Sequence, residues 1–331
     1  MKALVTGGGG FLGKAIVEQL LERDVEVRSM SRGDYPGLRE MGVETICGDI
    51  ADARAVSAAV EGCDIVYHVA AKAGVWGPYE EYYRPNVMGT ENILDACRIH
   101  EVDRLVYTSS PSVVYGDEPL RGVDESVDYP QNYLTAYPET KAIAERKVMK
   151  ANGTALKTVA LRPHLIWGPG DNHLVPRIVD RARRGKLKKI GDGEAVVDSV
   201  YIDDAARAHL LAADALETGD EAAGKVYFIT QGEPMAIGEL LDRIVAAAGL
   251  EPIDSHVPAK IAYGMGWMLE TIYRLFRRKN EPLMTRFVAK QLSTDHYFDI
   301  SAARDDLGYE PRWTIDEGMK ELGRWIHDEE I

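Results

Sequence analysis

Apolar runs alternate with helical patterns over the first two thirds of the chain. Residues 3–5 have the pattern of a buried strand, and after a glycine-rich turn Leu12, Ile16 and Leu20 follow at the spacing of one helix face. Further strands are predicted at 25–27, 44–46, 65–67, 105–107 and 158–161, and further helices at 52–60, 86–98 and 136–151. This alternation predicts right-handed crossovers, and therefore an α/β fold with a doubly wound parallel sheet.

The pattern changes after Arg162. Proline and glycine interrupt it at 163–170, and residues 257–287 are predicted to be helical, with large side chains such as Trp267 and Phe276. We therefore predict a smaller, mixed C-terminal domain that covers the sheet. The predicted boundaries are 1–165 for the first domain, rejoined by about 194–230, and 166–193 with 231–331 for the second.

A glycine-rich loop joins the first strand to the first helix. In T-G-G-G-G-F-L-G, Gly7, Gly10 and Gly13 are spaced three apart. Glycine allows a tight turn, close approach of the backbone to a pyrophosphate and packing of the helix on its strand, while the helix N-terminus offers free N–H groups to the phosphates. A flexible turn is the simpler alternative, but the position between strand and helix favours a dinucleotide cofactor.

The end of the second strand indicates which dinucleotide binds. A site that prefers NAD usually has a carboxylate here, which accepts hydrogen bonds from the ribose hydroxyls. This chain has Ser31 and Arg32, which suit a 2′-phosphate, so the sequence predicts NADP(H), with NAD(H) as the alternative if Arg32 stacks on the adenine. Asp49, after the third strand, is either an acceptor for the adenine amino group or a capping residue.

Candidate catalytic residues follow along the chain. Y-P-E-T-K places Tyr137 and Lys141 four residues apart on one helix face. A phenol has a pKa of about 10, which a neighbouring ammonium and a positive nicotinamide ring would lower. Upstream, Y-T-S-S-P-S-V-V ends a strand with hydroxyl groups that can bind a substrate oxygen, and we prefer Ser110, with Ser109 and Ser112 as alternatives.

The composition limits the class of protein, its possible partners and its cellular compartment. Of 331 residues, 45% are hydrophobic and 28% charged, as in a globular protein. No apolar run reaches the roughly 18–20 residues of a membrane span, and the formal net charge of −14 disfavours nucleic acid as a partner. Three separated cysteines and histidines without ligand spacing indicate neither a disulfide framework nor a metal site, so we expect a cytoplasmic protein.

These motifs resemble the extended short-chain dehydrogenase/reductase superfamily over essentially the whole chain. N-V-M-G-T and R-P-H-L-I-W-G-P resemble further superfamily motifs, with Trp167 in place of the usual tyrosine. The resemblance implies a Rossmann fold in which Tyr137 donates or accepts the proton, Lys141 activates it and Ser110 binds the substrate oxygen. The cofactor-binding residues predicted from motifs and resemblance together are Gly7, Gly10, Phe11, Leu12, Gly13, Ser31, Arg32, Asp49, Ile50, Ala70, Ala71, Lys72, Asn86, Ser109, Tyr137, Lys141, Pro163 and Leu165.

Within this superfamily the chain most resembles the 3β-hydroxysteroid dehydrogenase-like branch. A-A-K-A-G-V-W-G and E-P-L-M-T-R-F are particularly similar to segments of 2-alkyl-3-oxoalkanoate reductases, with sterol-4α-carboxylate 3-dehydrogenases as further relatives. The resemblance implies interconversion of a 3-keto and a 3-hydroxy acid. An apolar stripe over 261–276 suits an apolar small-molecule substrate, although a core helix would show the same pattern. Candidates to meet the substrate carboxylate are Lys72, His164 and Arg286.

Basic residues follow the apolar stripe and raise the possibility of a membrane surface as a partner. Arg274, Arg277, Arg278 and Lys279 indicate either peripheral contact with a membrane surface or a solvated helix end. The resemblance also implies a homodimer.

Two rival functions share most of these motifs. A nucleotide-sugar epimerase or dehydratase that retains NAD would use the same loop and Tyr–Lys pair, and Arg181, Arg183 and Arg184 would then be candidates to bind a diphosphate. The absence of a carboxylate at positions 31–32 argues against it. A non-catalytic, cofactor-sensing protein of the same fold is the other alternative, but it would not need a proton donor.

Overall fold

A parallel seven-stranded sheet forms the centre of the protein. The structure is a computed structural model that describes residues 1–278 and 280–329. The strand order is β12-β7-β5-β4-β1-β2-β3, and every neighbouring pair is parallel. The strands are β1 (Lys2–Thr6), β2 (Glu26–Ser31), β3 (Glu44–Cys47), β4 (Ile65–His68), β5 (Arg104–Thr108), β7 (Lys157–Pro163) and β12 (Val226–Ile229). The order reverses between β1 and β4, and ligands of such sheets bind in the crevice at that point.

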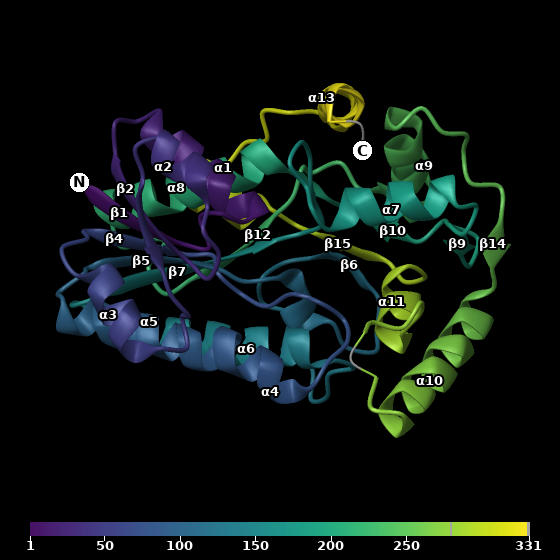
Figure 1. Ribbon diagram of the computed structural model, residues 1–331, viewed down its shortest axis with the longest axis horizontal. Helices are drawn as coiled ribbons and strands as arrows, with labels where there is room; N and C mark the ends of the chain where they lie inside the picture. Colours follow the sequence, from purple (N-terminus) through teal and green to yellow (C-terminus); the bar gives the residue numbers. More distant parts are fainter. Residues whose placement is uncertain (279, 330–331) are drawn as a thin grey trace.

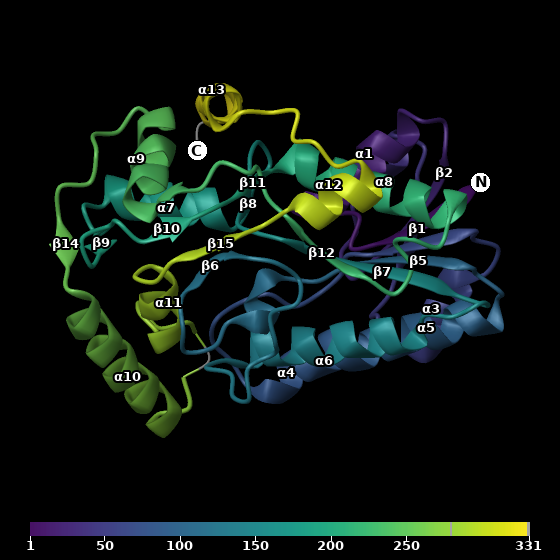
Figure 2. The same cartoon turned by 180° about the vertical axis from the view of Figure 1, so that it is seen from behind.

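Helices cover both faces of this sheet (Figures 1 and 2). One face carries α1 (Phe11–Leu21), α2 (Pro36–Glu40), α8 (Ile202–Thr218) and α12 (Ser301–Leu307), and the other carries α3 (Ala53–Val60), α5 (Gly89–Ile99) and α6 (Ala136–Ala151). Successive strand side chains enter opposite layers of the core, since Ala3 and Val5 join one buried apolar cluster and Leu4 joins the other. The predicted doubly wound sheet is therefore confirmed.

A smaller mixed sheet lies beyond the carboxyl ends of the large one, with the order β13-β10-β15-β6. β10 is antiparallel to β13 and parallel to β15, and β6, from the first predicted domain, pairs in parallel with β15. The strands of this sheet are β6 (Leu120–Val123), β10 (Val196–Val197), β13 (Met235–Ala236) and β15 (His296–Phe298). Two-stranded pairs join β8 (Ile166–Trp167) to β11 (Val200–Tyr201) and β9 (Lys189–Ile190) to β14 (His256–Val257).

The helices of this smaller part differ from the sequence prediction in one place. They are α7 (Leu174–Arg183), α9 (Ile237–Ala247), α10 (Ala259–Leu275), α11 (Arg286–Gln291) and α13 (Ile315–Asp328). The predicted continuous helix over 257–287 is wrong, because α10 ends at Leu275 and Arg277 adopts a positive φ of 49°. Pro282 follows in the loop, where a helix cannot continue, and Thr285 then caps α11. Within residues 1–278 and 280–329, no helix has the length and apolar content that crossing a bilayer would require.

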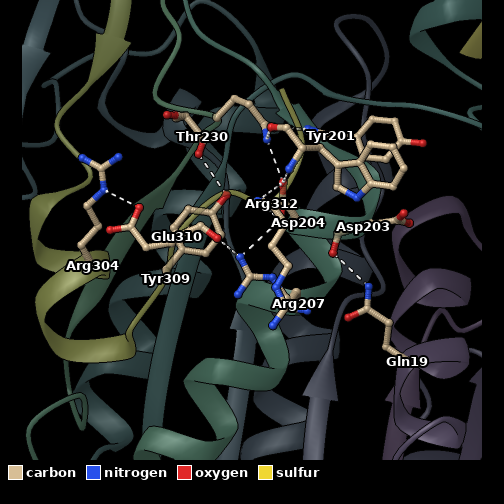
Figure 3. Close-up of polar contacts among 12 residues, drawn as sticks. Gln19, Tyr201, Asp203, Asp204, Arg207, Thr230, Arg304, Tyr309, Glu310 and Arg312 are labelled. Carbon is tan, nitrogen blue, oxygen red and sulfur yellow. Dashed lines mark hydrogen bonds and ion pairs between the residues drawn. The ribbon is translucent and has the colours of Figure 1, made fainter. Parts of the chain in front are cut away.

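A buried aspartate fastens the C-terminal segment to the large sheet (Figure 3). Asp204, in the first turn of α8, is 1% exposed, and its carboxylate accepts hydrogen bonds from the backbone N–H groups of Arg312 (2.9 Å) and Trp313 (3.0 Å). Nearby, the Tyr309 hydroxyl donates to the carbonyl of Thr230, just after β12, at 2.9 Å. The stretch between α12 and α13 is therefore anchored on the Rossmann part of the fold.

Candidate active site

A cavity of about 800 Å³ opens at the carboxyl edge of the large sheet, where the strand order reverses. It is lined by every predicted cofactor-binding residue except Asn86, and by Ser110. These lining residues are Gly7, Gly10, Phe11, Leu12, Gly13, Ser31, Arg32, Asp49, Ile50, Ala70, Ala71, Lys72, Ser109, Tyr137, Lys141, Pro163 and Leu165. The fold thus brings the glycine loop, the end of β2 and the Tyr–Lys helix around one space.

The glycine loop has a backbone that excludes side chains. Gly7 has a φ of +74°, and a Cβ atom at Gly13 would lie 2.2 Å from the carbonyl oxygen of Gly7. α1 begins directly after the loop at Phe11, where the unpaired N–H groups and the helix dipole favour phosphate. The residues present therefore fit the pyrophosphate of a dinucleotide.

Asn86 lies behind the cavity wall and does not line it. Its side chain is buried, accepts a hydrogen bond from the Lys72 N–H (2.7 Å) and donates to the Lys72 carbonyl (3.1 Å) and to Thr140 of α6 (3.0 Å). It belongs to a π-helical turn, Arg84–Met88, at the place where the sequence predicts the start of a helix at residue 86. Asn86 thus positions the 70–72 loop, which does line the cavity, against the helix that carries Tyr137.

Lys141 is held in the interior of the site. It is 2% exposed, its Nζ donates to the carbonyl of Thr108 at 2.5 Å, and the same atom lies 4.2 Å from the centre of the Tyr107 ring. Burial lowers its pKa to about 7, and the charge of Glu145, one helical turn away, partly opposes that shift. The ammonium is therefore fixed beside β5, four residues from Tyr137 on the same face of α6.

Tyr137 is partly buried in the same cavity wall. Burial raises the pKa of its phenol, while its hydrogen bond with Ser110 acts in the opposite direction. A neighbouring ammonium together with a positive nicotinamide ring was expected to lower this pKa, whereas in the protein alone desolvation is the largest influence. The phenol is therefore protonated near neutral pH and able to donate a proton.

The three candidate serines have different surroundings. Ser109 and Ser110 line the cavity, whereas Ser112 is buried beside them. The Oγ of Ser110 lies 2.9 Å from that of Ser112 and accepts a hydrogen bond from its N–H (3.2 Å), which fixes the Ser110 side chain. The Oγ of Ser109 is buried without a hydrogen-bond partner in the described part of the chain, as expected of a group that awaits a ligand. The contact between Ser110 and Tyr137 favours Ser110 as the substrate-binding hydroxyl.

The end of β2 meets the glycine loop at the cavity rim. Ser31 is the last residue of the strand, and its Oγ lies 3.5 Å from the N–H of Gly9. Arg32 follows as an exposed side chain that lines the cavity. Tyr35 also lines it, and its ring lies so close to Gly9 that a Cβ there would be 2.3 Å away. Tyr35 was not among the predicted residues, although an aromatic residue shortly after Ser31-Arg32 was a usable signal.

Asp49 forms a turn contact but does not cap a helix, and its role as an acceptor for the adenine amino group stays a prediction. Its carboxylate accepts a hydrogen bond from the N–H of Ala51 at 2.9 Å, which is a turn-capping contact. The same residue lines the cavity, and its other carboxylate oxygen lies 3.6 Å from the guanidinium of Arg84. The helix start at α3 is confirmed separately, because Asp52 caps it through the N–H groups of Arg54 and Ala55.

The three residues predicted to meet a substrate carboxylate do not form one cluster. His164 is buried and bound to Asp198 at 2.6 Å, and Arg286 forms an ion pair with Glu270 at 2.8 Å. Both are therefore committed to protein carboxylates. Of the three, Lys72 lines the large cavity, and its ammonium is also paired with a carboxylate, that of Glu81.

A second cavity of about 580 Å³ lies beside the first turn of α6. Tyr137 lines the first cavity, and its neighbours Ala136 and Glu139 line the second, so the two spaces flank the same helix turn. The other walls are mostly aromatic or basic and come from the 75–82 segment, from 133–135 and from the end of α10: Val75, Trp76, Gly77, Pro78, Tyr79, Tyr82, Tyr133, Leu134, Thr135, Glu270, Tyr273, Arg274, Arg277 and Arg278. The sequence analysis did not connect these segments, because they meet only through the tertiary fold.

Comparison with known proteins decides the family. The profile of the 3-beta hydroxysteroid dehydrogenase/isomerase family matches residues 4–258. The chain belongs to this family. The 2-alkyl-3-oxoalkanoate reductase of Stenotrophomonas maltophilia is 49% identical over 324 residues, which cover 97% of this chain and 98% of that protein. The decarboxylating sterol-4-alpha-carboxylate 3-dehydrogenase of Mus musculus is 33% identical over 331 residues, which cover 98% of this chain and 91% of the relative.

Solved structures agree with this membership at the level of the fold. The structure of MoeE5 in complex with UDP-glucose and NAD matches with a TM-score of 0.77 over 100% of both chains, at 24% identity. This member of the 3-beta hydroxysteroid dehydrogenase/isomerase family is therefore an extended short-chain dehydrogenase/reductase and an NAD(P)-dependent oxidoreductase that acts on CH–OH groups. The interpretation as a non-catalytic sensor is set aside.

Proposed function

We propose that the protein interconverts a 3-keto and a 3-hydroxy group on an apolar carboxylic acid with NADP(H), and that a long-chain 2-alkyl-3-oxo acid is the substrate. The observation that carries this proposal is the cluster of Tyr137, Ser110 and Lys141 on the wall of the large cavity. The glycine loop, which is distant in the sequence, lines the same cavity. The 49% identity to a 2-alkyl-3-oxoalkanoate reductase supports the substrate class.

The residues around the cavity divide the chemistry among them. The nicotinamide cofactor, when bound, supplies or accepts the hydride. In the direction of reduction, Tyr137 donates its phenolic proton to the ketone oxygen, and Ser110 donates a hydrogen bond to the same oxygen. Burial keeps the Tyr137 phenol protonated, which is the form that reduction requires. Lys141 is fixed by Thr108, and in its charged form it would hold the ribose of a bound nicotinamide cofactor and stabilise the phenolate that remains.

The second cavity is the proposed site for the rest of the substrate. Its aromatic walls provide apolar surface for alkyl chains, while Arg274, Arg277 and Arg278 provide cations for a carboxylate. Because the two cavities flank the first turn of α6, a substrate bound in the second one has a short path to Tyr137.

The test uses a long-chain 2-alkyl-3-hydroxy acid, since 3-oxo acids readily lose carbon dioxide. With NADP⁺ and purified protein, the expected result is formation of NADPH, measured by its absorbance. The matched control is the 2-alkyl acid without the hydroxyl group, which should give none. An inactive hydroxy acid, together with stoichiometric NAD released on denaturation, would instead favour the epimerase.

Arg32 is proposed to contact the 2′-phosphate, which makes cofactor preference testable. Replacing Arg32 by alanine is expected to weaken NADPH binding by roughly tenfold or more, because a hydrogen bond to a charged group contributes about 1.5–3 kcal/mol. NADH affinity should change little. Fluorescence titration of both cofactors measures the effect, and Arg54→Ala, at an exposed arginine outside the cavity lining, is the control. Equal losses for both cofactors in R32A would contradict the assignment.

A further inference from the structure

The outer face of α10 is a continuous apolar stripe. Ile261, Met265, Met268, Ile272 and Leu275 follow one another at spacings of four and three residues, so they lie on one side of the helix. Their exposed fractions are 56%, 42%, 48%, 37% and 76%. Large apolar side chains gathered in this way on one surface indicate an interaction site rather than scattered surface residues.

Only a narrow seam attaches α10 to the rest of the protein. Figures 1 and 2 show the helix at the edge of the molecule, side by side with α11. Ala262, Gly266 and Glu270 are the buried residues of this helix. A Cβ at Gly266 would lie 2.6 Å from the backbone nitrogen of Arg286, so glycine permits this close contact. Tyr273 and Arg274 line the second cavity, whereas the side of α10 that carries the apolar stripe faces outward.

The flanks of the apolar stripe are basic and aromatic. Lys260, Trp267 and Arg274 are exposed on one side of it, and Trp267 is 58% exposed. Arg277 and Arg278 are exposed just after the helix, whereas Lys279, which the sequence places with them, lies outside the described residues. The one carboxylate of α10, Glu270, is 4% exposed in its side chain and is paired with Arg286 at 2.8 Å and with Arg274 at 3.5 Å, so Lys260, Arg277 and Arg278 remain as the cations that it does not pair. This surface is therefore positive in a protein whose net charge is −14.

We propose that α10 lies in the headgroup region of an anionic lipid bilayer. An interfacial helix needs an apolar face that enters the acyl boundary, basic residues beside it that meet anionic headgroups, and aromatic residues at the boundary. The stripe from Ile261 to Leu275, the arginines at 274, 277 and 278, and Trp267 meet these three requirements.

A second copy of the chain is the other occupant of comparable shape, and charge argues against it. A two-fold pair of α10 helices would place the same surface against itself. Lys260 and Arg274 would then face equivalent cations, and the helix offers no exposed carboxylate to compensate, since Glu270 is buried. The negative charge of an anionic bilayer complements this positive surface, whereas a second copy of the same surface would repel it.

The second cavity lies next to the proposed membrane-binding surface, which suggests a function for membrane binding. Tyr273, Arg274 and Arg277 line that cavity at the end of α10, next to the residues that would contact the bilayer. An amphiphilic acid dissolved in the membrane would reach the cavity without crossing water. This use rests on the proposed function, whereas the docking itself does not.

Co-sedimentation with vesicles tests the docking without any activity measurement. The complete protein is expected to sediment with vesicles of phosphatidylglycerol and phosphatidylcholine in equal parts, and much less with pure phosphatidylcholine. Met268→Asp combined with Leu275→Asp should lower the partition coefficient by about tenfold or more, because charges then occupy the buried face. Arg277→Glu combined with Arg278→Glu should also lower it by about tenfold, and only at low salt.

Matched controls distinguish binding through this surface from non-specific adsorption of the protein to vesicles. Ile99→Asp, at an apolar residue of α5 that is 69% exposed, and Lys320→Glu, on α13, should leave vesicle binding unchanged. The proposal is overturned if the wild-type protein does not bind anionic vesicles, or if the controls weaken binding as much as the α10 variants. It is also overturned if light scattering shows a dimer that the Met268→Asp, Leu275→Asp variant dissociates, because α10 would then pair with a second copy.

Discussion

Tyr137→Phe is expected to reduce kcat by about 10²–10⁴-fold, the usual contribution of a positioned proton donor. The phenol touches Ser110 through a hydrogen bond and lines the cavity that also contains the glycine loop. Phenylalanine keeps the ring and therefore its packing, so only the transferable proton is lost. Steady-state turnover of a 3-hydroxy acid with NADP⁺ gives the measurement.

The cofactor provides the internal control for this variant. NADPH binding to Tyr137→Phe should stay within about threefold of the wild type, since Lys141 retains its own contact with Thr108 and does not depend on the phenol. A variant with full activity would remove Tyr137 from the mechanism. A variant that loses cofactor affinity as well as turnover would show that the hydroxyl has a binding role.

Glu145→Ala is expected to lower the free energy of unfolding by about 3–5 kcal/mol, because it leaves a buried charge without its partner. Glu145 and Arg162 have side chains that are 0% and 2% exposed, and two hydrogen bonds of 2.7 and 3.0 Å join them. The Tyr129 hydroxyl donates to the same carboxylate at 2.6 Å. Urea denaturation followed by circular dichroism measures the loss.

An exposed ion pair that also involves α6 is the matched control. Glu91 of α5 and Lys147 of α6 lie 2.7 Å apart, with side chains that are 41% and 39% exposed. Glu91→Ala should therefore cost less than about 1 kcal/mol, because water screens the pair and solvates the remaining lysine. Similar losses for the two alanine variants would mean that burial does not determine the strength of the Glu145–Arg162 pair.

Local patterns predicted those parts of the site whose chemistry depends on short spacings. The glycines at 7, 10 and 13 and the Tyr137–Lys141 pair each lie within one turn or loop, so their geometry follows from the sequence. The bounds of α6 agree with the predicted 136–151 for the same reason. The break after α10 was missed although residues 277–282 are charged, polar or proline, and Pro282 was a usable signal because a helix cannot continue through it.

Other features depend on contacts between distant segments and gave no readable signal. His164 looked free to meet a substrate, but its partner Asp198 comes from a different part of the chain. The second cavity joins the 75–82 segment to α10, which are about two hundred residues apart in sequence. In the protein alone, burial likewise raises the pKa of Tyr137, and burial is a property of the folded protein rather than of the Y-P-E-T-K motif.

The anchor at Asp204 has a consequence for how a bulky molecule enters. The backbone at Arg312 and Trp313 is hydrogen-bonded to Asp204 of α8. The segment that leads into α13 is therefore fixed to the part of the protein that contains the large sheet. A hinge motion that separates this segment from α8 would have to break these hydrogen bonds and expose the buried carboxylate of Asp204, at a cost of several kcal/mol. We therefore expect a substrate to enter the second cavity beside Trp76 and the end of α10, which line it, without separation of the two halves.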